Sequence, residues 1–525
     1  MATSFSEFCV SVDSLLQQQS FIEAAATLAD DALEYLPEHA AQLRERILRL
    51  PEELWASHPS LALTLAASSR DLSPANPFAA LSYVDAADVL LFGGTFDSAL
   101  PVMSRAIRSS ALRGLGQLED AFAESDQAWE LLATIELPLR TRMQLQSLAL
   151  AQRGICRMFL GELREARQDL EHALALQQER QDHALILEAR GCLALVEYFA
   201  GIPNSPYEQV AWHRESLESA PPVGVSEAPI LIVEGLLAID EGRVDLAEGL
   251  LGRIAETTAG TEYELLSAHL HSIVLGARSG PHEQLDALRD IRIQLRGWQS
   301  PGLLEQLHDS ERALALIECG EISAARDAMA ALLPDAYHAC CPARLLAILE
   351  LHTGEFESAL RRTDECKAMG DDHSPRNLAH VEVVRCVAHE ALGDSSIAAA
   401  AADRIFLQAA RTGWRYQFAA IPSHLLERVI DAARLRRNDR ETLAVLDELA
   451  LGLDTEQSNS VPPLSSRERV ILRHILAGET QHQISMELCV SPNTIKTQVR
   501  SIYRKLGAAS RHEVIDRAQR YGISV

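Results

Sequence analysis

Apolar residues recur at helical spacing from the beginning of the chain. Leu28, Leu33 and Leu36 follow one another at intervals of five and three residues, and Pro37 predicts a break after them. Spacing of this kind gathers apolar side chains on one face of a helix, which then needs a neighbour to cover it. We therefore expect residues 1–90 to form an N-terminal helical segment.

A six-residue pattern, Gly-x-φ-x-x-Ala with φ apolar, recurs through the middle of the chain. Its copies begin at residues 94, 116, 161, 242, 320 and 354, and a seventh copy at 393 has Ser395 at the apolar position. With weaker turns at Gly201 and Gly280, the starts from 161 onward are 40, 41, 38, 40, 34 and 39 residues apart. A period of this length is typical of a helical solenoid.

A small residue stands seven positions before each of these seven starts. The seven are Ala87, Ser109, Gly154, Gly235, Ala313, Ala347 and Cys386. Two helices that cross closely in a hairpin need small residues at the crossing, and the glycine between them takes the turn conformation. The pattern resembles the tetratricopeptide repeat, most fully over residues 150–177, and Ala-rich helical hairpins of no named family are the alternative. We predict an all-α fold in which residues 91–451 form a tetratricopeptide-like α-solenoid.

The helical pattern stops after Leu451. Residues 452–463, GLDTEQSNSVPP, have no apolar stripe and end in two prolines. This composition is typical of a linker that is flexible at first and stiffer at its prolines. We expect it to separate the repeat domain from a C-terminal domain at residues 464–525.

Four helix starts are visible in residues 464–525. Ser465, Thr480 and Ser510 are each followed three residues later by Glu or Gln, so each pair can form a reciprocal capping box. Ser491 precedes Pro492, which is a cap residue followed by proline at the first helical position. The segment is therefore predicted to contain four short helices.

The third of these helices, residues 492–506, has two contrasting faces. Its apolar face consists of Ile495, Val499, Ile502 and Leu506. The remaining surface is polar or basic and contains no acid, with Asn493, Lys496, Thr497, Arg500, Ser501 and Arg504. Because Cys489-Val490 leaves room only for a tight corner after the preceding helix, the pair predicts a helix-turn-helix, whose second helix enters the major groove of DNA.

The segment resembles the LuxR/GerE-type DNA-binding domain. Residues that carry the resemblance include Leu464, Ser465, Arg467, Glu468, Leu472, Gly478, Ile484, Leu488, Thr494, Lys496, Lys505, Leu506 and Gly507. Gln498 stands where the family usually has His, and Ser485 stands where it usually has Ala. Both departures keep the size of the side chain, so they bear on the preferred DNA sequence rather than on DNA binding.

The resemblance implies roles for individual residues. It places Lys496, Thr497 and Arg500 at base edges. It assigns contacts with phosphates to Ser491, Asn493, Thr494, Arg504 and Lys505. In this family a last helix such as 510–520 pairs two domains on a two-fold site, through residues that would here be Val514, Ile515 and Ala518. The expected partner is double-stranded promoter DNA, bound by a homodimer.

Charge is unevenly distributed along the chain, whose net charge is −26. Residues 464–525 hold ten Lys and Arg against five Asp and Glu, a net charge of +5. The other 463 residues hold 38 against 69, a net charge of −31. An acidic body with a basic end indicates that only the C-terminal domain contacts nucleic acid.

Catalysis and cofactor binding are not expected. The segment 50–66 resembles the entry to the helical-repeat region of MalT-like regulators, which often carry a nucleotide-hydrolysing domain. This sequence has only three lysines, and none follows a glycine as a phosphate-binding loop requires, so it resembles a shortened form of that architecture. The His and Cys residues between His338 and His389 could build a metal or redox sensor. They lack the short paired spacing of zinc sites, so we expect buried cysteines and surface histidines there instead.

The composition favours a cytoplasmic protein. Its nine cysteines are scattered, no apolar run reaches the length of a membrane span, and no basic residue precedes Arg44 as a signal segment would require. We predict a transcriptional regulator whose repeat domain senses a small-molecule or protein effector and controls the DNA-binding domain, with RNA polymerase as a further partner. The alternative is a repeat scaffold for a protein partner, with DNA binding secondary.

Overall fold

Helices are the only regular elements in the described part of this computed structural model. The structure describes residues 4–520 apart from 93–98, 178–182, 217–223, 301, 331, 333–338, 371–372, 438, 460–465, 489, 506–507 and 509. The prediction of an all-α fold is confirmed. None of the described helices is both long and apolar enough to cross a bilayer.

The chain folds into two compact units. The first unit contains Met1–Ala401 and Arg411–Ile421, and the second contains Ala402–Ala410 and Pro422–Val525. The first unit opens with α1 (Phe5–Gln17), α2 (Phe21–Ile47), α3 (Glu52–Trp55), α4 (Pro59–Ser68) and α5 (Pro77–Leu91). The break expected near Pro37 is a kink at His39 inside α2, where the backbone has φ −134° and ψ 24°.

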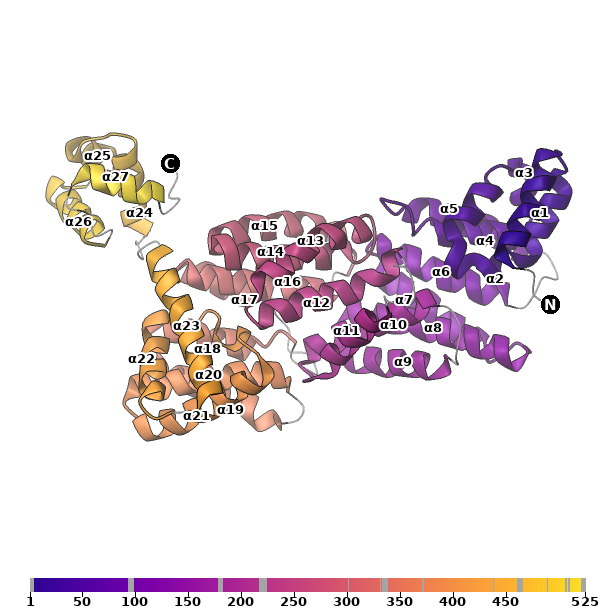
Figure 1. Ribbon diagram of the computed structural model, residues 1–525. Coiled ribbons are helices and arrows are strands. Elements are labelled where there is room, and N and C mark those ends of the chain that lie inside the picture. Colours follow the sequence, from indigo (N-terminus) through magenta and orange to yellow (C-terminus); the bar gives the residue numbers. More distant parts are fainter. Residues whose placement is uncertain are drawn as a thin grey trace. The chain divides into compact units, whose positions relative to one another are not determined.

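The first unit continues as a series of helix pairs (Figure 1). The helices are α6 (Leu100–Gly114), α7 (Leu118–Leu131), α8 (Leu139–Leu160), α9 (Leu163–Leu176), α10 (His183–Ala200), α11 (Ser205–Ser216), η1 (Gly224–Glu227), α12 (Ala228–Asp240), α13 (Val244–Thr258), α14 (Glu264–Ser279), α15 (Pro281–Leu295), α16 (Gly302–Glu318), α17 (Ile322–Met329), α18 (Pro342–Thr353), α19 (Phe356–Met369), α20 (Pro375–Leu392), α21 (Ser395–Thr412) and η3 (Tyr416–Phe418). Residues 402–410 of α21 belong to the second unit.

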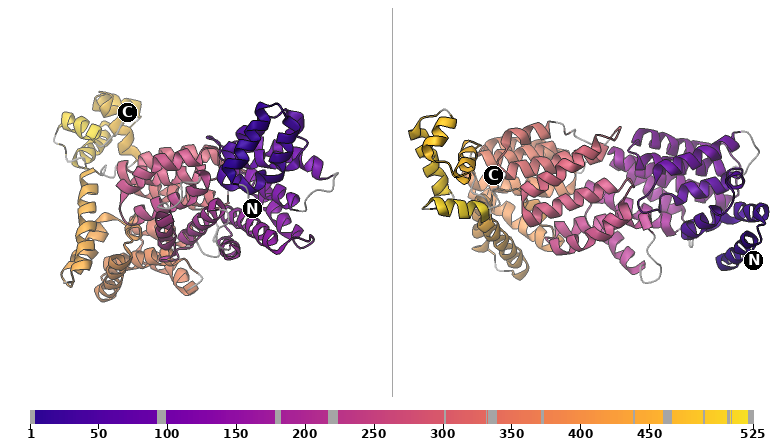
Figure 2. Two further views of the ribbon diagram at one scale, coloured as in Figure 1. Left: turned by 45° about the vertical axis from the view of Figure 1, so that its right-hand side comes forward. Right: turned by 90° about the horizontal axis from the view of Figure 1, so that it is seen from above.

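Each pair is a hairpin, and the first helices of successive hairpins form a layer. Helix α8 packs on α9, α12 on α13, and α18 on α19, while α8, α10, α12, α14, α16, α18 and α20 each contact the next in that series. Figure 2 shows these helices lying side by side. Stacked hairpins of this kind form the predicted tetratricopeptide-like solenoid.

The turn glycine and the small residues lie where the sequence pattern requires them. Between the two helices of a hairpin, Gly116, Gly161, Gly242, Gly320, Gly354 and Gly393 have φ between 73° and 90°. The turn of the first copy, at residue 94, lies outside the described residues. All seven small residues are buried, and Ser109 Oγ donates to the Ala121 carbonyl at 2.7 Å. A Cβ added to Gly154 would lie 3.2 Å from the Ala166 carbonyl oxygen, so here too the crossing leaves no room for a larger side chain.

Buried ion pairs join helices of the first unit that are far apart in sequence. Arg113 on α6 is fully buried and donates to Glu262 Oε1 at 3.0 Å from Nη2 and 3.1 Å from Nε. Arg70 donates to the same oxygen at 2.8 Å and to Glu188 Oε2 on α10 at 3.0 Å. Burial alone would raise the pKa of Glu188, but the charges of Arg70 and Arg113 outweigh it and the pKa is lowered.

A second buried group ties α20 to α10 and α12. Arg376 donates from Nε to Asp240 Oδ2 at 3.1 Å and from Nη2 to Tyr198 Oη at 2.6 Å. Its guanidinium also lies 4.1 Å from the centre of the Tyr416 ring. Burial raises the pKa of Asp240 although Arg376 opposes it. A solenoid wound differently would separate these partners and leave buried charges unpaired, at a cost of several kcal/mol. The ion pairs therefore favour this winding.

The second unit contains the last helices. They are α22 (Ser423–Arg434), α23 (Arg440–Asn459), α24 (Ser466–Leu476), α25 (Gln481–Glu487), α26 (Pro492–Lys505) and α27 (Arg511–Arg520). Helix α23 continues to Asn459, so the described part of the expected linker, residues 452–459, is helical. The absence of an apolar stripe did not prevent helix formation there, because Leu, Glu and Gln lose little rotamer freedom in a helix. The rest of the expected linker lies outside the described residues.

The close hairpin crossing predicts the effect of enlarging Gly154. A valine there would meet Leu170 Cγ, which lies 2.8 Å from an added Cβ. Overpacking of this kind costs about 1–3 kcal/mol, so Gly154→Val should lower the melting temperature measured by circular dichroism. The matched control is Gly252→Val in α13, where an added Cβ has no atom within 4 Å. Equal melting temperatures for the two variants would contradict the packing account.

The buried His269 on α14 predicts a stability that falls as the pH falls. Burial, assisted by His308, lowers the pKa of His269 to about 3 from an ordinary value of 6.5. Below pH 6.5 the unfolded chain therefore binds a proton that the folded chain excludes, and stability falls by up to about 1.4 kcal/mol per pH unit until the folded pKa is reached. Between pH 7.5 and 5.5, the melting temperature of His269→Asn should fall less than that of the wild type. The exposed His172, changed to Gln, should leave the wild-type fall unaltered.

Candidate nucleic-acid interface

Helices α24 to α27 of the second unit share one apolar core. Helix α26 packs against α24 and α25, and α27 packs against α24. The buried residues of this core are Ile471, Leu472, Ile475, Ile484, Ile495, Val499, Ile502, Val514 and Ala518. Because every described helix of the domain contributes to this core, α26 is held with one face inward and the other outward.

The predicted caps begin three of these helices. At α25 the reciprocal capping box is complete, since the Thr480 backbone N–H also donates to Gln483 Oε1 at 2.8 Å. Ser465, the expected cap of α24, lies outside the described residues. In each described cap, the hydroxyl oxygen accepts a hydrogen bond from the backbone N–H of the residue three positions later, at an N–O distance of 3.1–3.3 Å. The backbone N–H of Gln483 donates to Thr480, that of Thr494 to Ser491 and that of Glu513 to Ser510.

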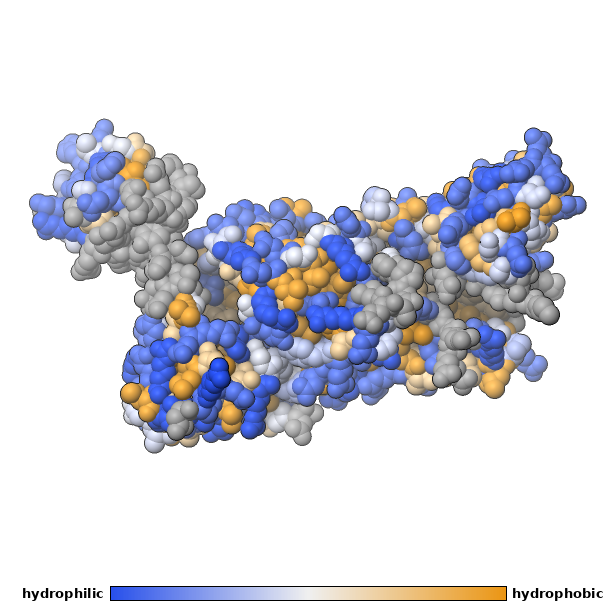
Figure 3. All heavy atoms as spheres, viewed as in Figure 1, coloured by the Kyte–Doolittle hydropathy of each residue, from blue (hydrophilic) through white to orange (hydrophobic). Residues whose placement is uncertain are grey.

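Helix α26 divides its side chains as the sequence predicts. Ile495 and Ile502 are 0% exposed and Val499 is 4% exposed, whereas Leu506 lies outside the described residues. The residues expected at base edges are all exposed: Lys496, Thr497 and Arg500. Most of the described surface of this domain in Figure 3 is hydrophilic. An outward basic face on the second helix of the motif is the arrangement that major-groove binding requires.

Two polar contacts fix the orientation of the flanking helices. Ser501 Oγ on α26 donates to Glu468 Oε1 on α24 at 2.7 Å, and Glu468 is only 3% exposed. Arg511 Nη2 at the start of α27 donates to the Ile475 carbonyl near the end of α24 at 2.7 Å. A cation bound to a carbonyl at a helix C-terminus also interacts favourably with the helix dipole. The first contact ties α24 to α26, which carries Lys496 and Arg500, and the second ties α27 to α24.

The residues expected at phosphates are only partly described. Ser491 and Thr494 are exposed at the N-terminus of α26, and their hydroxyl oxygens lie 2.8 Å apart. The side chains of Asn493, Arg504 and Lys505 lie outside the described residues. Because helix N-termini present backbone N–H groups, this end of α26 is chemically suited to a phosphate.

The expected dimer contacts on α27 need correction. Val514 and Ala518 are 0% exposed and belong to the core of their own domain. They therefore hold α27 in place and are not available to a second copy. Ile515, the third expected contact, is partly exposed. The helical period explains the error, since residues four apart share the inward face while their neighbour turns toward the surface.

Sequence reasoning missed a group of side chains in the first unit. Cys341, Cys366 and His373 come together, and His373 is buried although a surface position was expected for the histidines of residues 338–389; His338 itself is not described. Hydrogen bonding with Cys341 and burial both raise the pKa of the Cys366 thiol. The separations of 25 and seven residues follow from the hairpin geometry and match no short motif. No sequence signal beyond the local abundance of Cys and His points to this cluster.

A short helix, a tight corner and a second helix with an outward basic face define a helix-turn-helix domain, joined here to a helical repeat. Residues 462–518 match the family model described as GerE, bacterial regulatory proteins, luxR family. The C-terminal part of the chain is therefore a LuxR-type helix-turn-helix domain.

Curated relatives align with this domain. The HTH-type transcriptional regulator MalT of Yersinia pestis (strain Pestoides F) is 47% identical over 58 residues, which are 11% of this chain and 6% of MalT. The probable transcriptional regulatory protein NarL of Mycobacterium tuberculosis (strain CDC 1551 / Oshkosh) is 33% identical over 98 residues, 19% of this chain and 44% of NarL. The similarity thus spans a small part of MalT and less than half of NarL.

Solved helical-repeat structures are similar at low levels. The Cut9–Hcn1 hetero-tetramer of the APC/C gives a TM-score of 0.36 at 10% identity, covering 85% of this chain and 96% of the other. The TPR domain of P58(IPK) gives a TM-score of 0.23 at 14% identity, covering 77% and 99%. With scores this low, the assignment of a helical repeat rests on the hairpin stacking itself.

Proposed function

We propose that the protein is a DNA-binding transcriptional regulator. The observation that carries this proposal is the division of α26, with Ile495, Val499 and Ile502 buried and Lys496 and Arg500 exposed. The similarity of the domain to the transcriptional regulators MalT and NarL supports the same function.

The exposed face of α26 has the chemistry of a base-reading surface. Lys496 and Arg500 offer donors that match the two acceptors on the major-groove edge of guanine. Thr497, between them, offers a hydroxyl and a methyl group. Contacts with phosphates, proposed for the N-terminal residues of α26 and for Arg504 and Lys505, would set the register of the helix without selecting a sequence.

The repeat is proposed to receive the signal. Its effector is a small molecule or a protein, and RNA polymerase is the proposed partner at the promoter. The buried pairs between Arg113 and Glu262 and between Arg376 and Asp240 support this role, because they couple distant helices of the solenoid. A ligand that shifts one of these helices therefore acts on several others.

A homodimer on DNA is also proposed. One small domain makes few contacts, and two copies on a two-fold site double them. Ile515 is the one expected dimer residue of α27 that is partly exposed, so it is the proposed contact.

Losing one base-contacting cation should weaken specific binding. We expect Lys496→Ala and Arg500→Ala each to reduce affinity for the protein's own upstream DNA by about 1–3 kcal/mol, roughly 5–150-fold. The measurement is fluorescence anisotropy of full-length protein at fixed salt. Lys367→Ala is the matched control, because Lys367 lies in the repeat with 49% of its side chain exposed.

The outcome also separates this function from the scaffold alternative. Wild-type affinity in both variants would contradict base contact by α26. A protein partner that stays bound to variants unable to bind DNA would instead favour a scaffold in which DNA binding is secondary.

Placing a charge on the exposed part of α27 should separate the two copies. We expect Ile515→Asp to shift the complex on a two-fold DNA site from two chains toward one, as measured by mass photometry, because a carboxylate opposes burial at an interface. The exposed His512 on the same helix, changed to Ala, is the control. An unchanged two-chain complex in Ile515→Asp would exclude this face as the dimer contact.

A further inference from the structure

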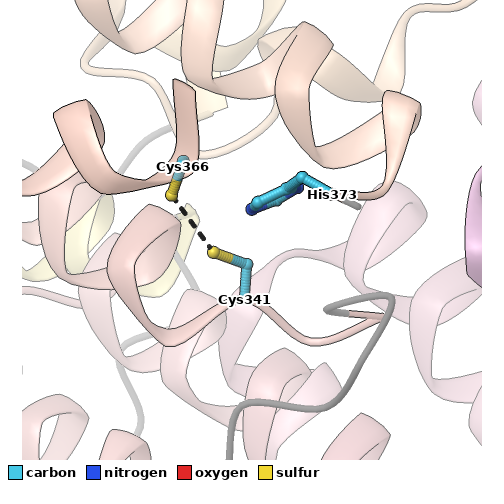
Figure 4. Close-up of side chains that lie close together, drawn as sticks. All are labelled: Cys341, Cys366 and His373. Carbon is cyan, nitrogen blue, oxygen red and sulfur yellow. Dashed lines mark hydrogen bonds between the residues drawn. The ribbon is translucent and has the colours of Figure 1, made fainter. Parts of the chain in front are cut away.

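Three buried side chains from three successive elements of the solenoid meet at one point (Figure 4). Cys341 is the N-cap residue of α18, Cys366 lies on α19, and His373 lies just before α20. Cys341 and His373 are 0% exposed and Cys366 is 2% exposed. The cluster therefore lies where α18, α19 and the start of α20 come together.

The distances within this cluster match those of ligands to one metal ion. One ligand atom from each residue lies within 4.8 Å of the other two, and the sulfurs of Cys341 and Cys366 are 3.6 Å apart. Two thiolates on a tetrahedral Zn²⁺, with Zn–S bonds of about 2.3 Å, are separated by about 3.8 Å. A disulfide would need the sulfurs at about 2.05 Å, so the observed spacing is the spacing of two ligands.

The histidine is oriented as a metal ligand. Figure 4 shows the ring of His373 pointing toward the two sulfurs. Its Nδ1 lies 3.3 Å from the Ser374 carbonyl oxygen. When Nδ1 carries the hydrogen and donates it to that carbonyl, Nε2 keeps its lone pair for a metal. A backbone carbonyl that holds the second ring nitrogen is the usual outer support of a metal-bound histidine.

Apolar side chains pack against the cluster. Val381 is buried against Cys341 and Cys366, and the partly buried Ala343 and Leu378 pack against the same group. Two soft sulfur donors and an imidazole in an apolar setting suit a borderline-soft ion and disfavour Mg²⁺ or Ca²⁺, which take oxygen ligands.

We propose that Cys341, Cys366 and His373 bind one Zn²⁺ ion. On binding, each thiol releases its proton to solvent and ligates the ion as a thiolate. The ion links the N-terminus of α18 to α19 and to the segment that leads into α20. The same helix α20 carries Arg376, so the site fixes the helix that forms the buried pair with Asp240. Three protein ligands leave a fourth coordination position for water or another donor.

The test uses full-length protein purified under reducing conditions. Elemental analysis should find one zinc per chain, and replacement by Co²⁺ should give the thiolate-to-cobalt charge-transfer absorption and the visible bands of a tetrahedral site. Loss of a residue that hydrogen-bonds to a metal ligand weakens metal binding roughly 10–100-fold. Cys341→Ser and Cys366→Ser each remove a ligand itself, so they should lose these bands and weaken zinc binding by more than that. His373→Gln should weaken binding while keeping the charge-transfer absorption.

Cys9→Ser and Cys340→Ser are the controls, the first remote from the cluster and the second next to Cys341 in sequence but outside the cluster. Both should retain one zinc per chain. Circular dichroism of each variant separates loss of a ligand from loss of fold, and the cobalt spectrum of the wild type tests the site without any substitution. A wild-type protein that binds no stoichiometric zinc, or that gives no thiolate absorption with Co²⁺, would overturn the proposal. So would full zinc binding by Cys341→Ser and Cys366→Ser.

Discussion

The repeat depends on how closely two helices of a hairpin can approach. At the crossing of α6 and α7, Ser109 Oγ donates to the Ala121 carbonyl of the second helix. At the crossing of α8 and α9, a Cβ added to Gly154 would lie 3.2 Å from the Ala166 carbonyl oxygen. A larger side chain at either position would push the helices apart and change the angle at which the next hairpin stacks. The small residues therefore help to determine the geometry of the layer formed by the first helices of the hairpins.

The same winding brings charges together that are far apart along the chain. Arg113 and Glu262 are 149 residues apart and almost fully buried, and α8 contacts α16. In an ideal solenoid each repeat touches only its neighbours, and stability is a sum of local terms. Here a buried arginine would lose its partner if one turn were displaced, at a cost of several kcal/mol. The first unit therefore behaves less like a row of independent hairpins than a sequence repeat alone suggests.

The sequence could predict those features that depend on a local period. Gly161 and Ala166 identify a hairpin because they recur, and Ile495, Val499 and Ile502 identify the inward face of α26 because they fall at helical spacing. The other features depend on distance in space. Neither the Arg113–Glu262 pair nor the meeting of Cys341 with His373 has a sequence period.

Two predictions differ from the structure, one drawn from the family resemblance and one from local composition. The family resemblance implies a dimer contact through the last helix and therefore through Val514, yet Val514 lies in the core of its own domain. Residues 452–459 were expected to be flexible because they lack an apolar face, yet they extend α23. For Val514 the packing of α27 on its own domain, which the local sequence does not reveal, decided the outcome.

The scarcity of lysine gives the exposed Lys496 an unusual position. The chain has 48 basic residues, and only Lys367, Lys496 and Lys505 among them are lysines. Two of the three lie on α26, and the third is near Glu382 in the repeat, with a separation of 3.9 Å. Acetylation neutralises lysine but leaves arginine unchanged. An acetyltransferase acting on lysine side chains would therefore leave the many arginine pairs of the solenoid intact and act chiefly on α26, the helix proposed to contact DNA.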